Sequence, residues 1–229
     1  YFLKNKFPGM TEYFAAKTGY KNSEVMLIYN KENSVSPITT HIPLKKVVRF
    51  ISKENIIKNI ITINNFYKKY LKKTPSFAIT GVNPHCESTD RFSEEDKIIL
   101  PAIKILKRKK INISGPYPAD TIFLKKNLKK YDIFIGMYHD QVLTPIKTIY
   151  EFEAINITLG LPFIRITPDH GPNNFPCGSP RPTGAAGCCR RTTSGRCRRR
   201  RSLSRTWRGQ LCSFLPYSES RSAQSLSFQ

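Results

Sequence analysis

The amino-acid usage of this 229-residue chain changes abruptly near residue 175, and the change limits how much of the chain can share one fold. Residues 1–174 contain 23 Lys, 4 Arg and 25 Ile, whereas residues 175–229 contain 11 Arg and 10 Ser but no Lys, Ile or Asn. A folded domain needs apolar residues at regular spacing, and the second segment has no such periodicity. We therefore expect a folded region over 1–174 and a disordered tail rich in Arg and Ser over 175–229.

The same boundary divides charge and cysteine. Of the formal net charge of +22, residues 1–174 carry +12 and residues 175–229 carry +10. Five of the six Cys lie past the boundary without the C-x-x-C spacing of a zinc site. Lys, Ile and Asn have AT-rich codons, so their replacement by Arg, Ala, Gly and Pro predicts a shifted reading frame or foreign sequence. The start at Tyr1, without an initiator Met or a signal sequence, predicts a chain that begins partway through a larger protein.

Residues 1–174 alternate short β-rich runs with helical patterns, as is typical of an α/β domain with a mostly parallel sheet. A helix is expected to begin at Ser52 and to run to Leu71, and another begins near Ser93 with a second helical piece from Pro101. Residues 115–118 are expected to form a rigid loop. Strands are predicted over residues 25–29, 36–40, 77–82, 111–114, 132–138, 154–159 and 163–166.

Three of the four histidines, His41, His85 and His139, each follow a predicted strand. In open α/β sheets the loops after parallel strands meet at one edge, where ligands bind. Taken singly, each imidazole is more simply a structural or surface residue. Together they could supply the protein ligands of a catalytic divalent metal that keeps open positions for a substrate.

Basic side chains near these histidines suit an anionic substrate. Lys147 lies eight residues beyond His139, and Arg165 lies nine residues beyond Asn156. Lys147 could equally be a solvated surface charge, since it is one of many lysines. Arg165 is a stronger candidate, because it lies in an apolar run where an unpaired charge is costly.

Six segments, in this order, resemble one enzyme family closely. They are Gly9-Met10-Thr11-Glu12-Tyr13-Phe14, Thr39-Thr40-His41-Ile42-Pro43-Leu44, Asn83-Pro84-His85, Gly115-Pro116-Tyr117-Pro118-Ala119-Asp120-Thr121, Met137-Tyr138-His139-Asp140-Gln141 and Asn156-Ile157-Thr158-Leu159-Gly160-Leu161-Pro162-Phe163-Ile164-Arg165. The chain is similar over about 1–173 to the C-terminal half of the 4-hydroxythreonine-4-phosphate dehydrogenase family. The last two segments are long and specific.

The resemblance implies a fold and a reaction. The fold is the two-lobed type of isocitrate and isopropylmalate dehydrogenase, here incomplete. The reaction is NAD- or NADP-dependent oxidation of 4-phosphooxy-L-threonine at its secondary hydroxyl, followed by decarboxylation to 3-amino-2-oxopropyl phosphate, in the biosynthesis of pyridoxal 5'-phosphate (vitamin B6). Because much of one lobe is missing, the resemblance also implies that this piece alone is inactive.

The resemblance further implies site residues and partners. His41, His85 and His139 would hold a divalent metal, zinc, magnesium, cobalt or manganese, at the subunit interface of a homodimer, with one His reaching across from the partner. The substrate contacts carry over to Thr11, Lys147, Asn156 and Arg165. Asp140, beside His139, could orient that ligand or could equally cap a helix.

Two departures from the family bear on the substrate. Met10 stands where the family usually has a substrate-contacting His, and Met can neither donate a hydrogen bond nor titrate near neutral pH. Cys86 follows His85 where the family has a glycine-rich loop, and a small buried residue is expected there. Relatives of the family act on threonate or erythronate 4-phosphate, so a dehydrogenase for another four-carbon phosphorylated hydroxy acid is the alternative.

The basic tail suggests a second class of function. Arg198-Arg199-Arg200-Arg201 would attract polyanions, but the composition break favours adventitious nucleic-acid binding over a selected role. The chain has no apolar run of the ~18 residues that a membrane helix needs, and Cys86 is its only Cys before the boundary. We therefore expect a cytoplasmic protein without a membrane or nucleic-acid partner.

Overall fold

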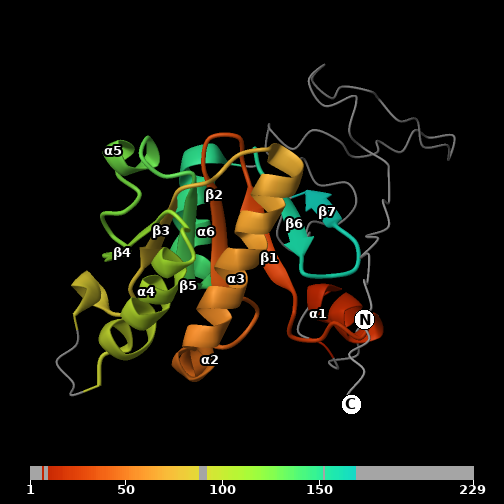
Figure 1. The fold of residues 1–229 in the computed structure, drawn as a ribbon, viewed down its shortest axis with the longest axis horizontal. Helices are drawn as coiled ribbons and strands as arrows, with labels where there is room; N and C mark the ends of the chain where they lie inside the picture. Colours follow the sequence, from red (N-terminus) through yellow and green to blue (C-terminus); the bar gives the residue numbers. More distant parts are fainter. Residues whose placement is uncertain (1–6, 8–9, 88–91, 152, 169–229) are drawn as a thin grey trace, which may run out of the picture.

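The computed structural model describes residues 7, 10–87, 92–151 and 153–168, and the predicted tail over 175–229 lies outside them. The described part forms a seven-stranded sheet in the order β4-β3-β5-β2-β1-β6-β7 with helices on both faces (Figure 1). This confirms the predicted α/β class. The strands are β1 (Val25–Tyr29), β2 (Ser34–Thr39), β3 (Phe77–Thr80), β4 (Ile113–Tyr117), β5 (Ile133–Tyr138), β6 (Ile155–Leu159) and β7 (Arg165–Pro168).

The sheet is mixed, not mostly parallel as predicted. The pairings of β2 with β5, β5 with β3 and β3 with β4 are parallel, whereas those of β1 with β2, β1 with β6 and β6 with β7 are antiparallel. The connections 30–33 and 160–164 are too short for a crossover, so each forces a hairpin. β1 joins the two parts of the sheet, pairing with β6 at five register positions but with β2 at one, Ile28 opposite Val35.

Two layers of helices cover the sheet. One face packs against α3 and α4, whose buried side chains include Ile56, Ile60 and Leu106, and the other face packs against α6 through Val142 and Ile146. Among the described residues, no helix is both long enough and apolar enough to cross a bilayer. The helices are α1 (Met10–Lys17), α2 (Val47–Phe50), α3 (Lys53–Phe66), α4 (Leu100–Arg108), α5 (Lys125–Leu128) and α6 (His139–Tyr150), with shorter helical turns η1 (Leu44–Lys46), η2 (Tyr67–Leu71), η3 (Pro84–Cys86) and η4 (Glu95–Ile99).

The helix boundaries follow the predicted start and stop signals. Ser52 caps α3 by accepting a hydrogen bond from the Asn55 amide at 3.2 Å, and η2 continues the helical path to Leu71. Pro101 lies in the first turn of α4, as expected. The predicted loop at 115–118 is wrong in part, because β4 extends through Tyr117 and pairs there with Thr80.

Gly160, in the turn between β6 and β7, has a φ of +78°, and a Cβ there would lie 1.9 Å from the backbone oxygen of Ser23. The variant Gly160→Ala is therefore expected to lower the free energy of unfolding by roughly 2–4 kcal/mol in urea titrations. Gly19→Ala is the matched control, since Gly19 has the same φ with nothing within 4 Å of its added Cβ. It should cost only ~1 kcal/mol. Equal losses in the two variants would contradict the proposed clash.

Candidate functional site

The carboxyl ends of three neighbouring parallel strands bring the histidines to one edge of the sheet. β3, β5 and β2 are adjacent and run in the same direction. His41 follows β2 after Thr40, His139 follows β5 as the first residue of α6, and His85 lies in η3 beyond β3. The edge has the position at which open α/β sheets bind ligands.

His41 and His139 lie side by side at this edge. Their ring centroids are 5.6 Å apart and their planes are inclined by 44°. Each Nδ1 faces a carboxylate, with Glu12 Oε1 at 3.5 Å from His41 and Asp140 Oδ1 at 2.7 Å from His139. The hydrogen bond to Glu12 raises the pKa of His41 despite the opposing effect of burial. A carboxylate on each Nδ1 leaves Nε2 as the nitrogen that presents to a ligand.

Glu12 is a site residue that the sequence pattern does not identify. It lies on α1, and its Oε1 accepts a hydrogen bond from the Thr40 hydroxyl at 3.1 Å in addition to the contact with His41. Its second oxygen, Oε2, is buried without a hydrogen-bond partner among the described residues. The signal was its position beside Thr11 in the first family-like segment, but nothing in the sequence indicates that α1 reaches the end of β2.

His85 does not join this pair within one chain. In the part of the chain that the structure describes, no three His, Cys, Asp or Glu side chains are placed to hold one metal ion. His85 and Cys86 both adopt left-handed backbone conformations, with φ values of +57° and +61°. Such conformations cost non-glycine residues roughly 1–2 kcal/mol each, so the surrounding structure must hold the loop in place.

Glu95 holds that loop. Its side chain is 2% exposed, and Oε1 accepts hydrogen bonds from the backbone amides of Val82 at 2.7 Å and Asn83 at 2.9 Å. Oε2 accepts from the Asn83 side-chain amide and from the Ser93 hydroxyl. Burial acts to raise the pKa of Glu95, but these donors outweigh it and hold the pKa below its usual value. The sequence alone does not identify this role, because the donors to Glu95 lie on the other side of the loop.

Gln141 ties the two histidine loops to each other. It is 8% exposed, and its Oε1 accepts from the Met137 amide at 2.7 Å and from the Thr80 hydroxyl at 2.9 Å. Its Nε2 donates to the Gly81 carbonyl at 2.8 Å. One amide side chain therefore links the end of β3 to the end of β5. Gln141 belongs to the family-like segment around His139, but the sequence does not indicate this role.

Asn156 and Arg165 lie on the β6–β7 hairpin. Arg165 pairs with Thr158 across the two strands, and its guanidinium carbon lies 5.7 Å from the centroid of the Phe14 ring. Burial lowers the pKa of Arg165. Asn156 Oδ1 is buried without a hydrogen-bond partner among the described residues. A partly desolvated cation beside an unsatisfied amide oxygen is suited to a polar ligand.

The remaining predicted residues occupy two helices. Thr11 lies on α1 beside Glu12, and Lys147 lies half-buried in α6, the helix that His139 begins. Met10 is 37% exposed at the start of α1. Cys86 is half-buried, and burial raises the pKa of its thiol, so it does not have the character of an activated nucleophile.

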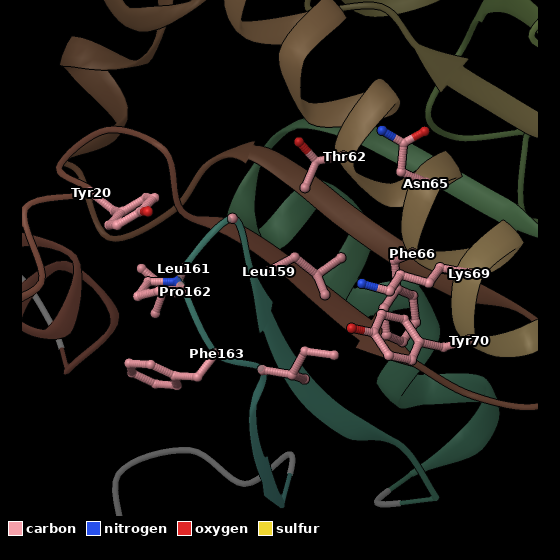
Figure 2. A pocket seen from close by; sticks show the side chains of 12 residues that line it. Tyr20, Thr62, Asn65, Phe66, Lys69, Tyr70, Leu159, Leu161, Pro162 and Phe163 are labelled. Atoms are coloured by element: carbon pink, nitrogen blue, oxygen red, sulfur yellow. The ribbon is translucent and has the colours of Figure 1, made fainter. Parts of the chain in front are cut away.

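A separate groove of about 270 Å³ lies between α3 with η2 and the 160–164 turn (Figure 2). Aromatic side chains of Tyr20, Phe66, Tyr70 and Phe163 line much of it. None of the seven predicted site residues contributes to its lining. The groove is therefore distinct from the edge that carries His41 and His139.

Comparison with known proteins places these features in a family context. The profile of the family described as "Pyridoxal phosphate biosynthetic protein PdxA" matches residues 3–174. The 4-hydroxythreonine-4-phosphate dehydrogenase of Sulfurihydrogenibium sp. is 44% identical over 173 residues, which cover 74% of this chain and 53% of that protein. The D-threonate 4-phosphate dehydrogenase of Pectobacterium atrosepticum is 36% identical over 166 residues, with coverage of 72% and 51%.

A solved structure agrees with the sequence matches. The crystal structure of 4-hydroxythreonine-4-phosphate dehydrogenase from Klebsiella pneumoniae superposes with a TM-score of 0.63 at 34% identity, covering 74% of this chain and 52% of that one. The chain thus spans about half the length of the relatives that it matches.

Proposed function

The chain belongs to the PdxA family, and on that premise we propose that it is part of a dehydrogenase that oxidises the secondary hydroxyl of 4-phosphooxy-L-threonine with NAD or NADP as acceptor. Loss of carbon dioxide from the oxidised product then gives 3-amino-2-oxopropyl phosphate, a step in pyridoxal 5'-phosphate formation. The chain corresponds in this proposal to the C-terminal half of the family. The observation that carries it is the His41–His139 pair, which presents two Nε2 atoms at a ligand-binding edge.

The donor set fits a divalent metal. Two imidazoles whose Nδ1 atoms face carboxylates have the arrangement of metal-binding histidines and their orienting partners. We propose that His41 and His139 of one subunit and His85 of the partner subunit complete the site, because three ligands do not converge within the described part of one chain. A bound divalent ion would supply Lewis acidity, which polarises the substrate hydroxyl and stabilises the negative charge that develops on its oxygen.

In this proposal, other residues bind the anionic groups of the substrate. Arg165 binds a phosphate or carboxylate oxygen, Lys147 contributes a second positive charge, and Asn156 and Thr11 contribute polar contacts. The partial burial of Arg165 supports its assignment. The unsatisfied oxygen of Asn156 is an acceptor, so it suits a donor of the substrate such as the ammonium or hydroxyl group. Holding both ends of a four-carbon substrate orients its hydroxyl, which is the positioning contribution to catalysis.

A second substrate class is supported by one relative. The Pectobacterium protein bears the name D-threonate 4-phosphate dehydrogenase, and threonate carries a hydroxyl where threonine carries an amine. Arg165 and Lys147 would serve either compound, because both compounds carry phosphate and carboxylate. Met10 removes one hydrogen-bonding group from the neighbourhood of Thr11, so discrimination between the two rests on other residues of the site.

Binding and turnover by the 229-residue chain test the proposal. Calorimetric titration with 4-phosphooxy-L-threonine is expected to show binding that requires Co²⁺ and disappears with a chelator. D-threonate 4-phosphate, titrated in parallel, identifies the preferred class. NAD reduction is expected to be absent, since the chain spans half of its relatives' length. Metal-independent binding of equal strength would contradict the site, and steady NAD reduction would contradict the expected inactivity.

A further inference from the structure

One buried polar group in the hairpin is left unused by the proposed function. Thr158, near the end of β6, is 0% exposed, and its Oγ1 has no hydrogen-bond partner among the described residues. A buried hydroxyl without a partner is unfavourable relative to an apolar group of the same shape. Val has that shape and suits a strand at least as well as Thr, so packing alone does not explain a hydroxyl at this position.

The strand register places Thr158 among residues of the proposed anion site. Thr158 is directly opposite Arg165 on β7, and directly opposite residues of an antiparallel pair lie on the same face of the sheet. Asn156 lies two residues earlier on β6 and therefore shares that face. The cross-strand neighbour of Asn156 on β1 is Ile28, which packs in the core beneath α6. The face shared by Asn156, Thr158 and Arg165 is therefore the α6 face of the sheet.

Three polar groups on this face therefore have hydrogen-bonding or charge-pairing capacity that no described residue satisfies. Asn156 Oδ1 and Thr158 Oγ1 are buried without partners, and among the described residues no ion pair is formed by Arg165, whose guanidinium lies over the Phe14 ring. A ligand with anionic oxygens would accept hydrogen bonds from the Arg165 guanidinium and from the Thr158 hydroxyl together.

We propose that Thr158 is a further substrate-binding residue, whose hydroxyl donates a hydrogen bond to the anionic group that Arg165 binds. The inference rests on the proposed function, because it uses the same phosphorylated hydroxy acid. It adds a neutral donor beside the cation. The β6 backbone holds that donor in place, and its hydroxyl has no competing partner among the described residues before the ligand arrives.

The test separates ligand binding from folding through Thr158→Val, which removes the hydroxyl but keeps the shape. Its midpoint of thermal unfolding is expected to equal or exceed that of the wild type, because no described hydrogen bond is lost. Its Kd for 4-phosphooxy-L-threonine, titrated with Co²⁺ present, is expected to rise roughly tenfold to a hundredfold. Thr158→Ser should restore binding.

Thr62→Val is the matched control. Thr62 lies on α3, on the other face of the sheet, and its hydroxyl donates to the Lys58 carbonyl at 2.8 Å. This variant should keep the wild-type Kd.

Three results would overturn the inference. A lower unfolding midpoint for Thr158→Val would show that the hydroxyl serves the fold. An unchanged Kd for Thr158→Val beside a raised Kd for Arg165→Gln would remove Thr158 from the site and leave the proposed function standing. Absence of binding by the wild-type chain would overturn both.

Discussion

Mixing two variants that each fail to bind metal, His85→Ala and His139→Ala, is expected to restore metal sites. Each variant alone should lose at least roughly a hundredfold in Co²⁺ affinity, since changes to orienting partners alone cost up to that much. With the proposed sharing of ligands, His41 and His139 of one subunit in a mixed dimer would meet His85 of the partner subunit, so one of the two sites would be complete. Random assembly should give about one quarter of the wild-type number of sites, measured by the visible absorption of bound Co²⁺.

The control for this experiment is the mixture of His41→Ala with His139→Ala. His41 and His139 lie side by side in one chain, so every site in that mixed dimer lacks one of them. No recovery is expected. Recovery of metal sites in the control mixture would rule out the proposed sharing of ligands between subunits. A lack of recovery in the mixture of His85→Ala with His139→Ala would rule it out as well.

We expect a second large effect from a variant that frees the loop before His85. Glu95→Gln replaces a buried carboxylate that accepts four hydrogen bonds with an amide that cannot accept all of them. We expect the free energy of unfolding to fall by roughly 2–4 kcal/mol, because two of the donors are buried backbone amides. Co²⁺ affinity should fall as well, since the Val82 and Asn83 amides just before His85 would lose the carboxylate that holds them.

The pH dependence of this effect follows from the direction of the pKa shift. The pKa of Glu95 is lower in the folded protein than in the unfolded chain, so its stabilising contribution is full above the unfolded value and is lost as pH falls. The stability difference between the wild type and Glu95→Gln should therefore be constant from about pH 6 to 8 and shrink below about pH 4.

Asp96→Asn supplies the matched control for Glu95→Gln, because Asp96 is an exposed carboxylate in the same helical turn. It should change the free energy of unfolding by less than about 0.5 kcal/mol. Equal losses in the two variants would mean that general charge at this turn, and not the contact with Val82 and Asn83, stabilises the loop.

The strands and the histidine edge could be predicted because they depend on local patterns. Runs such as 25–29 and 132–138 are apolar and short, and a His after each of three strands marks their ends. Strand direction was harder, because a parallel sheet was inferred from alternation alone. The four-residue link between β1 and β2 is the feature that fixes an antiparallel pair.

The supporting residues of the site could not be predicted, because their contacts join distant parts of the chain. Glu12 meets His41 across 29 positions, and Gln141 meets Gly81 across 60. Neither the spacing nor the residue type distinguishes Glu95 from its neighbour Glu94, and only the folded loop reveals which carboxylate is buried. Likewise, the sequence does not indicate that the Thr158 hydroxyl lacks a hydrogen-bond partner, because its neighbours depend on the strand register.

The position of the β1–β2 boundary between two groups of site residues has a mechanical consequence. His41 and His139 lie on one side of it, whereas Asn156, Thr158 and Arg165 lie on the other, and the two sides pair at one register position. In the proposed function, a substrate bound by residues on both sides would bridge the boundary at which the parallel strands meet the antiparallel ones. Substrate binding would then link the parallel and antiparallel parts of the sheet through a ligand as well as through the β1–β2 pairing.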